Sequence, residues 1–126
     1  MVKRGALSEY VDNLQAAGRL TFTREEAMAA LEVSMEALKL AALRLSKRRR
    51  LVSPRRGFYV IVPLENREAG APPLETWLPG LLRFHGVRAG EVVVEGVEVV
   101  VTVDRALRQC QCGLWEVTFR RLTPWC

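Results

Sequence analysis

The residues best suited to bind a ligand are basic and are concentrated in the middle of the chain. Between Ala37 and Leu64 there are eight Lys and Arg residues and no Asp or Glu, so this window carries +8 while the whole chain carries +5. The eight are Lys39, Arg44, Lys47, Arg48, Arg49, Arg50, Arg55 and Arg56. Ammonium and guanidinium groups gathered in this way attract polyanions, and the backbone of a nucleic acid is the partner that we expect.

Other reactive residue types form no catalytic or metal-binding pattern. Cys110 and Cys112 are separated by one residue rather than the two to four that zinc sites favour, and Cys126 adds only a third thiol. His85 is the only histidine, and it has neither a cysteine nor a carboxylate pair near it in sequence with which to build a triad or a dyad. We therefore expect no enzyme activity, no metal, no cofactor and no small-molecule substrate.

Two helices are predicted ahead of the basic window. Apolar residues recur every three or four positions from Leu7 to Leu14, and Gly18 follows where a left-handed cap would end a helix. Thr23 to Glu26 then fits a capping box, in which the Thr23 hydroxyl accepts from the Glu26 backbone N–H and the Glu26 carboxylate reaches back. The second helix is thus predicted to begin at Arg24 and to include Leu31.

A third helix is predicted from Met35 to Arg48, with Ser34 as its N-cap. Only three residues separate it from the second helix, so the two must cross steeply, as in a helix-turn-helix, whose second helix enters the DNA major groove. Glu32 lies in this turn at a position that often holds Gly, and a left-handed Glu costs about 1 kcal/mol.

The third helix has one clearly apolar face and one mixed face. Leu40 and Leu43 lie among polar residues on the second face, and the first face comprises Leu38, Ala41, Ala42 and Leu45. We expect Leu40 and Leu43 to be buried between neighbouring elements; the alternative is that they contact thymine methyl groups.

A basic β-hairpin is predicted after the third helix. Leu51–Ser53 and Phe58–Val62 are typical of short strands, and Pro54–Gly57 has the composition of a turn, with Arg55 and Arg56 at its tip. Three helices followed by this hairpin predict an α+β fold of the winged helix-turn-helix type for residues 1–65. Phe58, Val60 and Val62 would face the helical core and fix the hairpin to it.

This fold assigns eleven residues to a DNA-binding site. Four at the start of the third helix are positioned to reach base edges: Ser34, Met35, Glu36 and Lys39. The others are cations, of which those from Lys47 onward would bind flanking phosphates: Arg44, Lys47, Arg48, Arg49, Arg50, Arg55 and Arg56.

The second half of the chain has weaker signals. Residues 66–86 contain a Pro- and Gly-rich linker and an apolar segment around Trp77, interrupted by Pro79, which would pad the first domain. In residues 87–126, the valines from Glu91 to Val103 surround Gly96 and predict a two-stranded hairpin as a short appendage. Such a hairpin must pack on the first domain, pair with another chain or stay poorly ordered. A composition rich in Val, Gly, Arg, Cys and Trp is also what a shifted reading frame can yield.

One stretch resembles a known family. Leu7 to Glu65, LSEYVDNLQAAGRLTFTREEAMAALEVSMEALKLAALRLSKRRRLVSPRRGFYVIVPLE, resembles the N-terminal winged helix domain of AbiEi-type antitoxins of type IV toxin-antitoxin (abortive infection) systems. The similarity is strongest in TREEAMAAL and in KRRRLVSPRRGFYVIVP, extends weakly to Gly86 and ends there. It implies a cytoplasmic bacterial repressor that binds repeats in its own promoter and is paired with a nucleotidyltransferase-like toxin.

The prediction is therefore a sequence-specific DNA-binding repressor. The alternative is a protein-interaction module that binds a partner, such as a toxin, without specific DNA binding. Nonspecific RNA binding ranks third, because Tyr59 is the main aromatic available for stacking on bases. The N-terminus lacks a signal-peptide pattern and no apolar run approaches the ~18 residues of a membrane span, so we expect a cytoplasmic location and no membrane partner.

Overall fold

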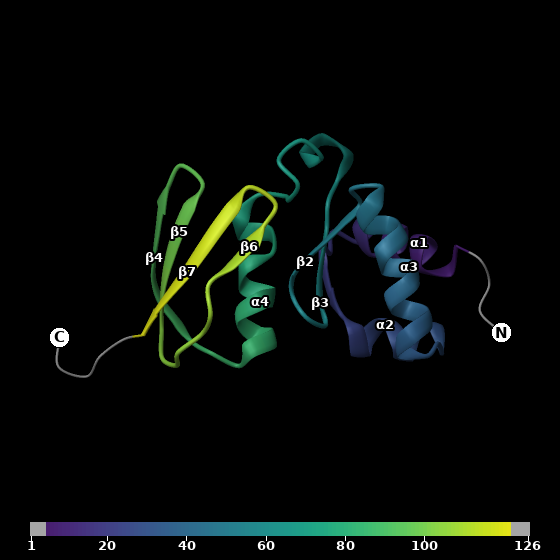
Figure 1. Ribbon diagram of the computed structural model, residues 1–126, viewed down its shortest axis with the longest axis horizontal. Helices are drawn as coiled ribbons and strands as arrows, with labels where there is room; N and C mark the ends of the chain where they lie inside the picture. Colours follow the sequence, from purple (N-terminus) through teal and green to yellow (C-terminus); the bar gives the residue numbers. More distant parts are fainter. Residues whose placement is uncertain (1–4, 122–126) are drawn as a thin grey trace.

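The computed structural model describes residues 5–121, which form four α-helices, two short 3-10 helices and two β-sheets. The α+β class predicted from the sequence is confirmed. The two sheets follow one another along the molecule, with α4 (Leu78–His85) between them (Figure 1).

Three helices make up the N-terminal end: α1 (Ala6–Ala16), α2 (Arg24–Leu31) and α3 (Met35–Lys47). The predicted capping box is present at α2, where the Glu26 N–H donates to Thr23 Oγ1 at 3.1 Å and the Thr23 N–H donates to Glu26 Oε1 at 2.9 Å. The predicted N-cap of α3 is also present, because Ser34 Oγ accepts from the Ala37 N–H at 3.2 Å. Local side-chain chemistry thus fixes where both helices begin.

The first sheet has three antiparallel strands in the order β1-β3-β2, namely β1 (Thr21–Thr23), β2 (Leu51–Arg55) and β3 (Phe58–Ile61). The β2–β3 turn is tighter than predicted, because Arg56 and Gly57 alone form it, with Gly57 at φ 83°. Pro54 lies inside β2, where the register shifts between Val52 and Arg55. A proline is tolerated there because β2 is an edge strand and the ladder is already interrupted.

Strand β3 is buried on both faces and joins two hydrophobic clusters. Tyr59 and Ile61 pack with the cores of α1, α2 and α3, whereas Phe58 and Val60 pack with α4 and the second sheet. The prediction that Phe58 and Val60 face the helical core is therefore wrong. The reason is that a strand covered on both sides shows no alternation of apolar and polar residues, so its faces cannot be assigned from the pattern.

The C-terminal half contains more strands than the single hairpin predicted. The expected hairpin is present as β4 (Ala89–Glu95) and β5 (Glu98–Val103), with Gly96 at φ 61° in the turn. Two further strands, β6 (Cys110–Cys112) and β7 (Trp115–Arg121), complete a sheet of order β4-β5-β7-β6 in which β5 and β7 are parallel. β6 has only three residues and β5 pairs with β7 across a crossover, so the local sequence gives little sign of this sheet.

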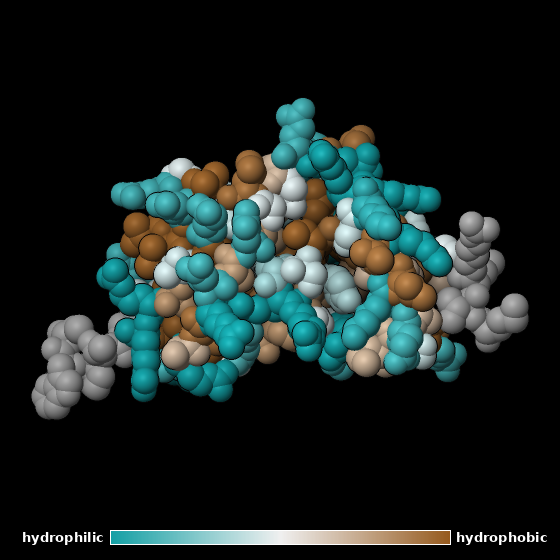
Figure 2. Space-filling view, viewed as in Figure 1, coloured by the Kyte–Doolittle hydropathy of each residue, from teal (hydrophilic) through white to brown (hydrophobic). Residues whose placement is uncertain are grey.

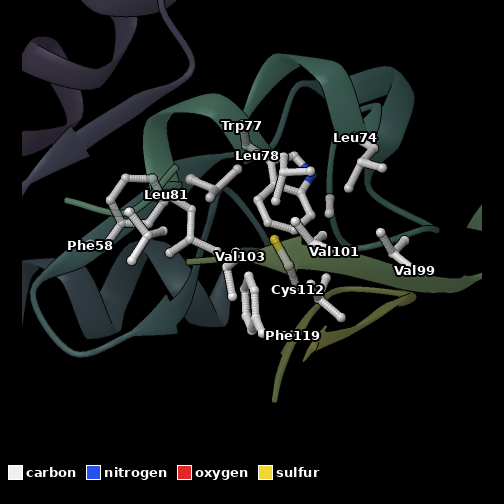
Figure 3. Packing of buried hydrophobic residues seen from close by; sticks show 14 residues of the cluster. Phe58, Leu74, Trp77, Leu78, Leu81, Val99, Val101, Val103, Cys112 and Phe119 are labelled. Carbon is white, nitrogen blue, oxygen red and sulfur yellow. The ribbon is translucent and has the colours of Figure 1, made fainter. Parts of the chain in front are cut away.

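The second sheet packs on α4 around Trp77, whose side chain is fully buried. Leu78 and Leu81 of α4 meet Val101, Val103 and Phe119 of the sheet in this cluster, as Figure 3 shows. Pro79 lies in the first turn of α4 and does not interrupt it, since the first turn needs no backbone donor at that position. The 3-10 helices Leu64–Asn66 and Leu74–Thr76 lie in the connection between β3 and α4. Three alternatives were predicted for the Val-rich hairpin: packing on the first domain, pairing with another chain, or poor order. In the structure its sheet packs on the residues that precede it in the chain.

Among the residues that the structure describes, no helix is both long and apolar enough to span a membrane.

Candidate nucleic-acid interface

Helix α3 exposes a continuous stripe on the side opposite to its buried residues Leu38, Ala42 and Leu45. The stripe comprises Glu36, Leu40, Leu43 and Lys47, and Lys39 and Arg44 are exposed on its two flanks. Hydrophilic side chains and apolar patches alternate on the visible face of the molecule (Figure 2). The helix thus offers both charged and apolar groups to a partner.

The prediction that Leu40 and Leu43 are buried is wrong. Their exposed fractions are 57% and 52%, because α1 and α2 cover only the opposite side of α3. A wheel cannot distinguish an apolar residue in a packed interface from one left open to solvent, because both give the same periodicity.

The basic cluster at the C-terminal end of α3 consists of Lys47, Arg48 and Arg49, and all three side chains are exposed. The three ion pairs between residues 5 and 121 involve Arg19, Arg24 and Arg50, so the charges of the basic cluster are not neutralised by another described side chain. They remain available for an external anion.

Helix α3 ends in a C-terminal cap in which the left-handed residue is usually glycine. The Arg50 N–H donates to the Leu45 carbonyl at 2.9 Å and the Arg49 N–H donates to the Ser46 carbonyl at 3.0 Å, the pattern of a Schellman motif. Its left-handed residue is Arg49, at φ 60°. An L side chain there costs about 1 kcal/mol relative to glycine. The chain therefore carries a cation at a position where stability alone favours Gly.

The side chain of Arg50 is engaged within the protein and is not free to bind a partner. Its guanidinium donates to Ser8 Oγ at 2.8 Å and forms an ion pair with Asp12, so it fastens the end of α3 to α1. We therefore exclude Arg50 from the cations that remain available for phosphate.

The hairpin tip, Arg56 and Gly57, is held close to the start of α2. The Gly57 carbonyl accepts from the Arg24 N–H at 2.8 Å. Arg56 is exposed, but Arg55 turns toward the second sheet, where its Nε donates to His85 Nε2 at 3.0 Å and its guanidinium contacts the carbonyls of Arg108 and Gln109. The two arginines predicted at the tip therefore differ in role: Arg56 is available to a partner, whereas Arg55 belongs to β2 and is engaged within the protein.

The structure separates the predicted cations into two groups. The basic cluster lies at the end of α3 where β2 begins, whereas Arg56 lies at the other end of β2, with about 13 Å of strand between them. The predicted base-reading residues Ser34, Met35, Glu36 and Lys39 lie at the N-terminal end of α3, where Ser34 also serves as the N-cap. The predicted site residues therefore lie along α3, at its two ends and at the far end of β2, rather than forming one patch.

The tertiary arrangement adds two cations that local sequence reasoning missed. Arg105 and Arg108 lie in the loop between β5 and β6, and contacts with His85 and Arg55 hold this loop against the β2–β3 hairpin. Their sequence neighbourhood contains Asp104 and gave no cationic signal. Only the fold brings them close to the hairpin.

Within residues 5–121, no three His, Cys, Asp or Glu side chains are grouped to hold a metal ion. Burial raises the pKa of Cys112 to about 12, with Cys110 contributing, so its thiolate is disfavoured. Burial, then the charges of Arg55 and Arg105, lower the pKa of His85, which accepts a hydrogen bond from Arg55 as a neutral imidazole. Cys126 lies outside the described residues.

The chain matches no protein-family model, and comparison with curated proteins and with solved structures gives no match either.

Proposed function

We propose that the protein binds duplex DNA through α3, and that residues 5–62 act as a winged helix-turn-helix in which the β2–β3 hairpin is a short wing. The observation that carries the proposal is the exposed, unneutralised basic cluster at one end of an exposed helix. The strand order β1-β3-β2 supports it, because β3 lies in the middle of the sheet and its Tyr59 and Ile61 fasten the hairpin to the core of the three helices.

The dimensions of α3 suit this role. Its 13 residues span about 20 Å, and the major groove is about 12 Å wide, so groups at the two ends of the helix reach phosphates on opposite sides of the groove. Lys47, Arg48 and Arg49 would contact one strand, and Arg56 would contact the other. These contacts give affinity without reading sequence.

Sequence would be read by the stripe between the two ends. Glu36 is suited to accept from the cytosine amino group and Lys39 to donate to guanine, while Leu40 and Leu43 present apolar surface to thymine methyl groups. Exposure of these two leucines, which the sequence did not predict, adds this apolar contact to the proposal.

The biological role follows from the resemblance of residues 7–65 to AbiEi-type antitoxins. We propose that the bound DNA is the promoter of the protein's own gene, that binding represses transcription and that a nucleotidyltransferase-like toxin is the paired protein. Residues 87–121 form a sheet that the resemblance does not include, so the proposal assigns them no antitoxin activity.

The salt dependence of binding to a labelled promoter duplex tests the proposal. Each phosphate contact contributes about −0.9 to the slope of log K against log salt. Replacing Lys47, Arg48 and Arg49 together by Ala should therefore make the slope shallower by nearly 3, while Glu36→Ala should leave it unchanged. Wild-type protein that does not bind duplex near 50 mM salt, or a triple variant with the parental slope, would reject the proposal.

A second candidate function is binding of a protein partner. A groove of about 670 Å³ lies between the start of α1 and α3; it is lined by apolar residues including Leu7, Val33 and Leu40, with Arg44 and Arg48 also lining it. This lining suits an amphipathic helix with acidic residues. Leu40→Ser should weaken such a complex, whereas Leu43→Ser should not, because Leu43 does not line the groove. On DNA both leucines are assigned to thymine methyl groups, so both substitutions should weaken binding, which distinguishes the two functions.

A further inference from the structure

We propose that Arg56 and Arg108 form a second contact with the DNA backbone, apart from the basic cluster, and that Arg55 and Arg105 position the loop that carries Arg108. The proposal rests on the proposed function, since it names a further part of the same interface. It assigns the loop between β5 and β6, in the C-terminal half, to the phosphates of the bound duplex.

The loop is attached to the hairpin by Arg55. The Arg55 Nε donates to His85 Nε2 at 3.0 Å, one terminal nitrogen lies 3.4 Å from the Gln109 carbonyl, and the other contacts the Arg108 carbonyl. The guanidinium carbon also lies 5.7 Å from the centre of the Phe119 ring. All the nitrogens of Arg55 are engaged, so it acts by holding its neighbours in place.

A second bond supports the same loop from α4. The Arg105 guanidinium donates to the His85 carbonyl at the end of α4. Arg55 and Arg105 therefore converge on one histidine from two different elements. Burial lowers the pKa of His85 most, and the positive charges of Arg55 and Arg105 lower it further because both lie close to the imidazole.

The side chains left exposed by this arrangement are cationic. Arg56 and Arg108 are exposed and form no ion pair or side-chain hydrogen bond with the rest of residues 5–121. The loop's carboxylate, Asp104, accepts from the Arg88 N–H at 3.1 Å. Arg56 follows Arg55 in the chain, and Arg108 supplies one of the carbonyls that Arg55 contacts, so the two exposed arginines lie on segments that Arg55 joins.

Duplex DNA is the anion that fits the position. The attached loop extends the cationic surface of the hairpin tip onto the C-terminal half. Guanidinium groups bind phosphate oxygens with two parallel hydrogen bonds, which suits Arg56 and Arg108. The duplex would then contact the protein at the hairpin tip and loop as well as at the basic cluster.

The test measures the salt slope of binding to a labelled duplex between about 50 and 200 mM salt, where each contact accounts for about a 3.5-fold change in affinity. Arg56→Ala with Arg108→Ala should make the slope shallower by about 2, and Arg108→Ala alone by about 1. Arg120→Ala is the matched control, because Arg120 follows Phe119 in β7 and so projects from the other face of the sheet. Its slope should stay at the wild-type value.

The outcomes separate the two proposals. If the Arg108→Ala slope equals that of wild type while replacement of the basic cluster reduces the slope, the second contact is refuted and the proposed function stands. If wild-type protein does not bind the duplex, both are refuted. If Arg120→Ala reduces the slope as much as Arg108→Ala, the contact is not localised to the loop and the inference is overturned.

The positioning role of Arg55 has its own readout. Arg55→Lys keeps the charge but cannot make the three contacts, so the loop should lose its fixed place beside the tip. In that background Arg108→Ala should change the slope by less than half of its effect in wild type. An equal effect in both backgrounds would overturn the positioning role.

Discussion

Arg49→Gly should make the protein more stable and its binding to DNA weaker. Arg49 has a left-handed backbone, at φ 60°, in the C-terminal cap of α3, and glycine removes a strain of about 1 kcal/mol there. With an unfolding entropy of about 2.1 cal/mol/K per residue over 126 residues, 1 kcal/mol corresponds to a rise in Tm of about 4 °C. The same substitution removes one exposed cation, so the salt slope on duplex DNA should become shallower by about 0.9.

Glu32→Gly is the matched control. Glu32 is also left-handed, at φ 52°, in the turn between α2 and α3, as predicted, but it carries no positive charge. We expect a similar rise in Tm by calorimetry and an unchanged salt slope. A fall in the Tm of both variants would refute the strain argument. A more stable Arg49→Gly protein that keeps the wild-type slope would refute the assignment of Arg49 to the DNA backbone.

Three further predictions concern parts of the structure that hold the site in place. Thr23→Ala should lower the free energy of unfolding by about 1 kcal/mol in urea denaturation, because it removes the N-cap of α2; no change would contradict the capping box. Because folding lowers the pKa of His85 below its usual 6.5, mainly through burial and then through Arg55 and Arg105, the unfolded state takes up a proton first. Stability present above pH 6.5 should thus fall as the pH decreases toward the folded-state pKa, and less so in His85→Gln; equal slopes in thermal melts would contradict this. Cys112, with its pKa raised to about 12 mainly by burial, should be alkylated only on unfolding, and rapid modification under native conditions, seen by peptide mapping, would contradict its burial.

The local features of the N-terminal half could be predicted from the sequence. The capping box at Thr23, the N-cap at Ser34 and the left-handed Gly18 and Glu32 each depend on residues within a few positions of one another. The hairpin also followed from its composition, although the turn is two residues long and Pro54 belongs to a strand. Such features depend on hydrogen bonds between residues close in sequence, so the residue types at those positions are enough to predict them.

The features that depend on tertiary packing could not be predicted. Both faces of β3 are buried because α4 and the second sheet cover the side away from the helices, and the pattern FYVI gives no sign of that. The pairing of β5 with β7 joins residues far apart in the chain. Arg50 and Arg55 looked like the other arginines in sequence, but the fold gives Arg50 an acid on α1 and gives Arg55 acceptors at the end of α4 and in the loop between β5 and β6.

The most direct test of the central claim is to map the DNA-binding surface by NMR. Amide shifts of labelled protein would be followed while a promoter duplex is added. Binding by α3 predicts shifts in residues 34–49 and at the hairpin tip, with little change at Val93 in the exposed edge strand β4. Shifts confined to β4 and β5, or no shifts at low salt, would contradict the claim that α3 and its flanking cations bind the duplex.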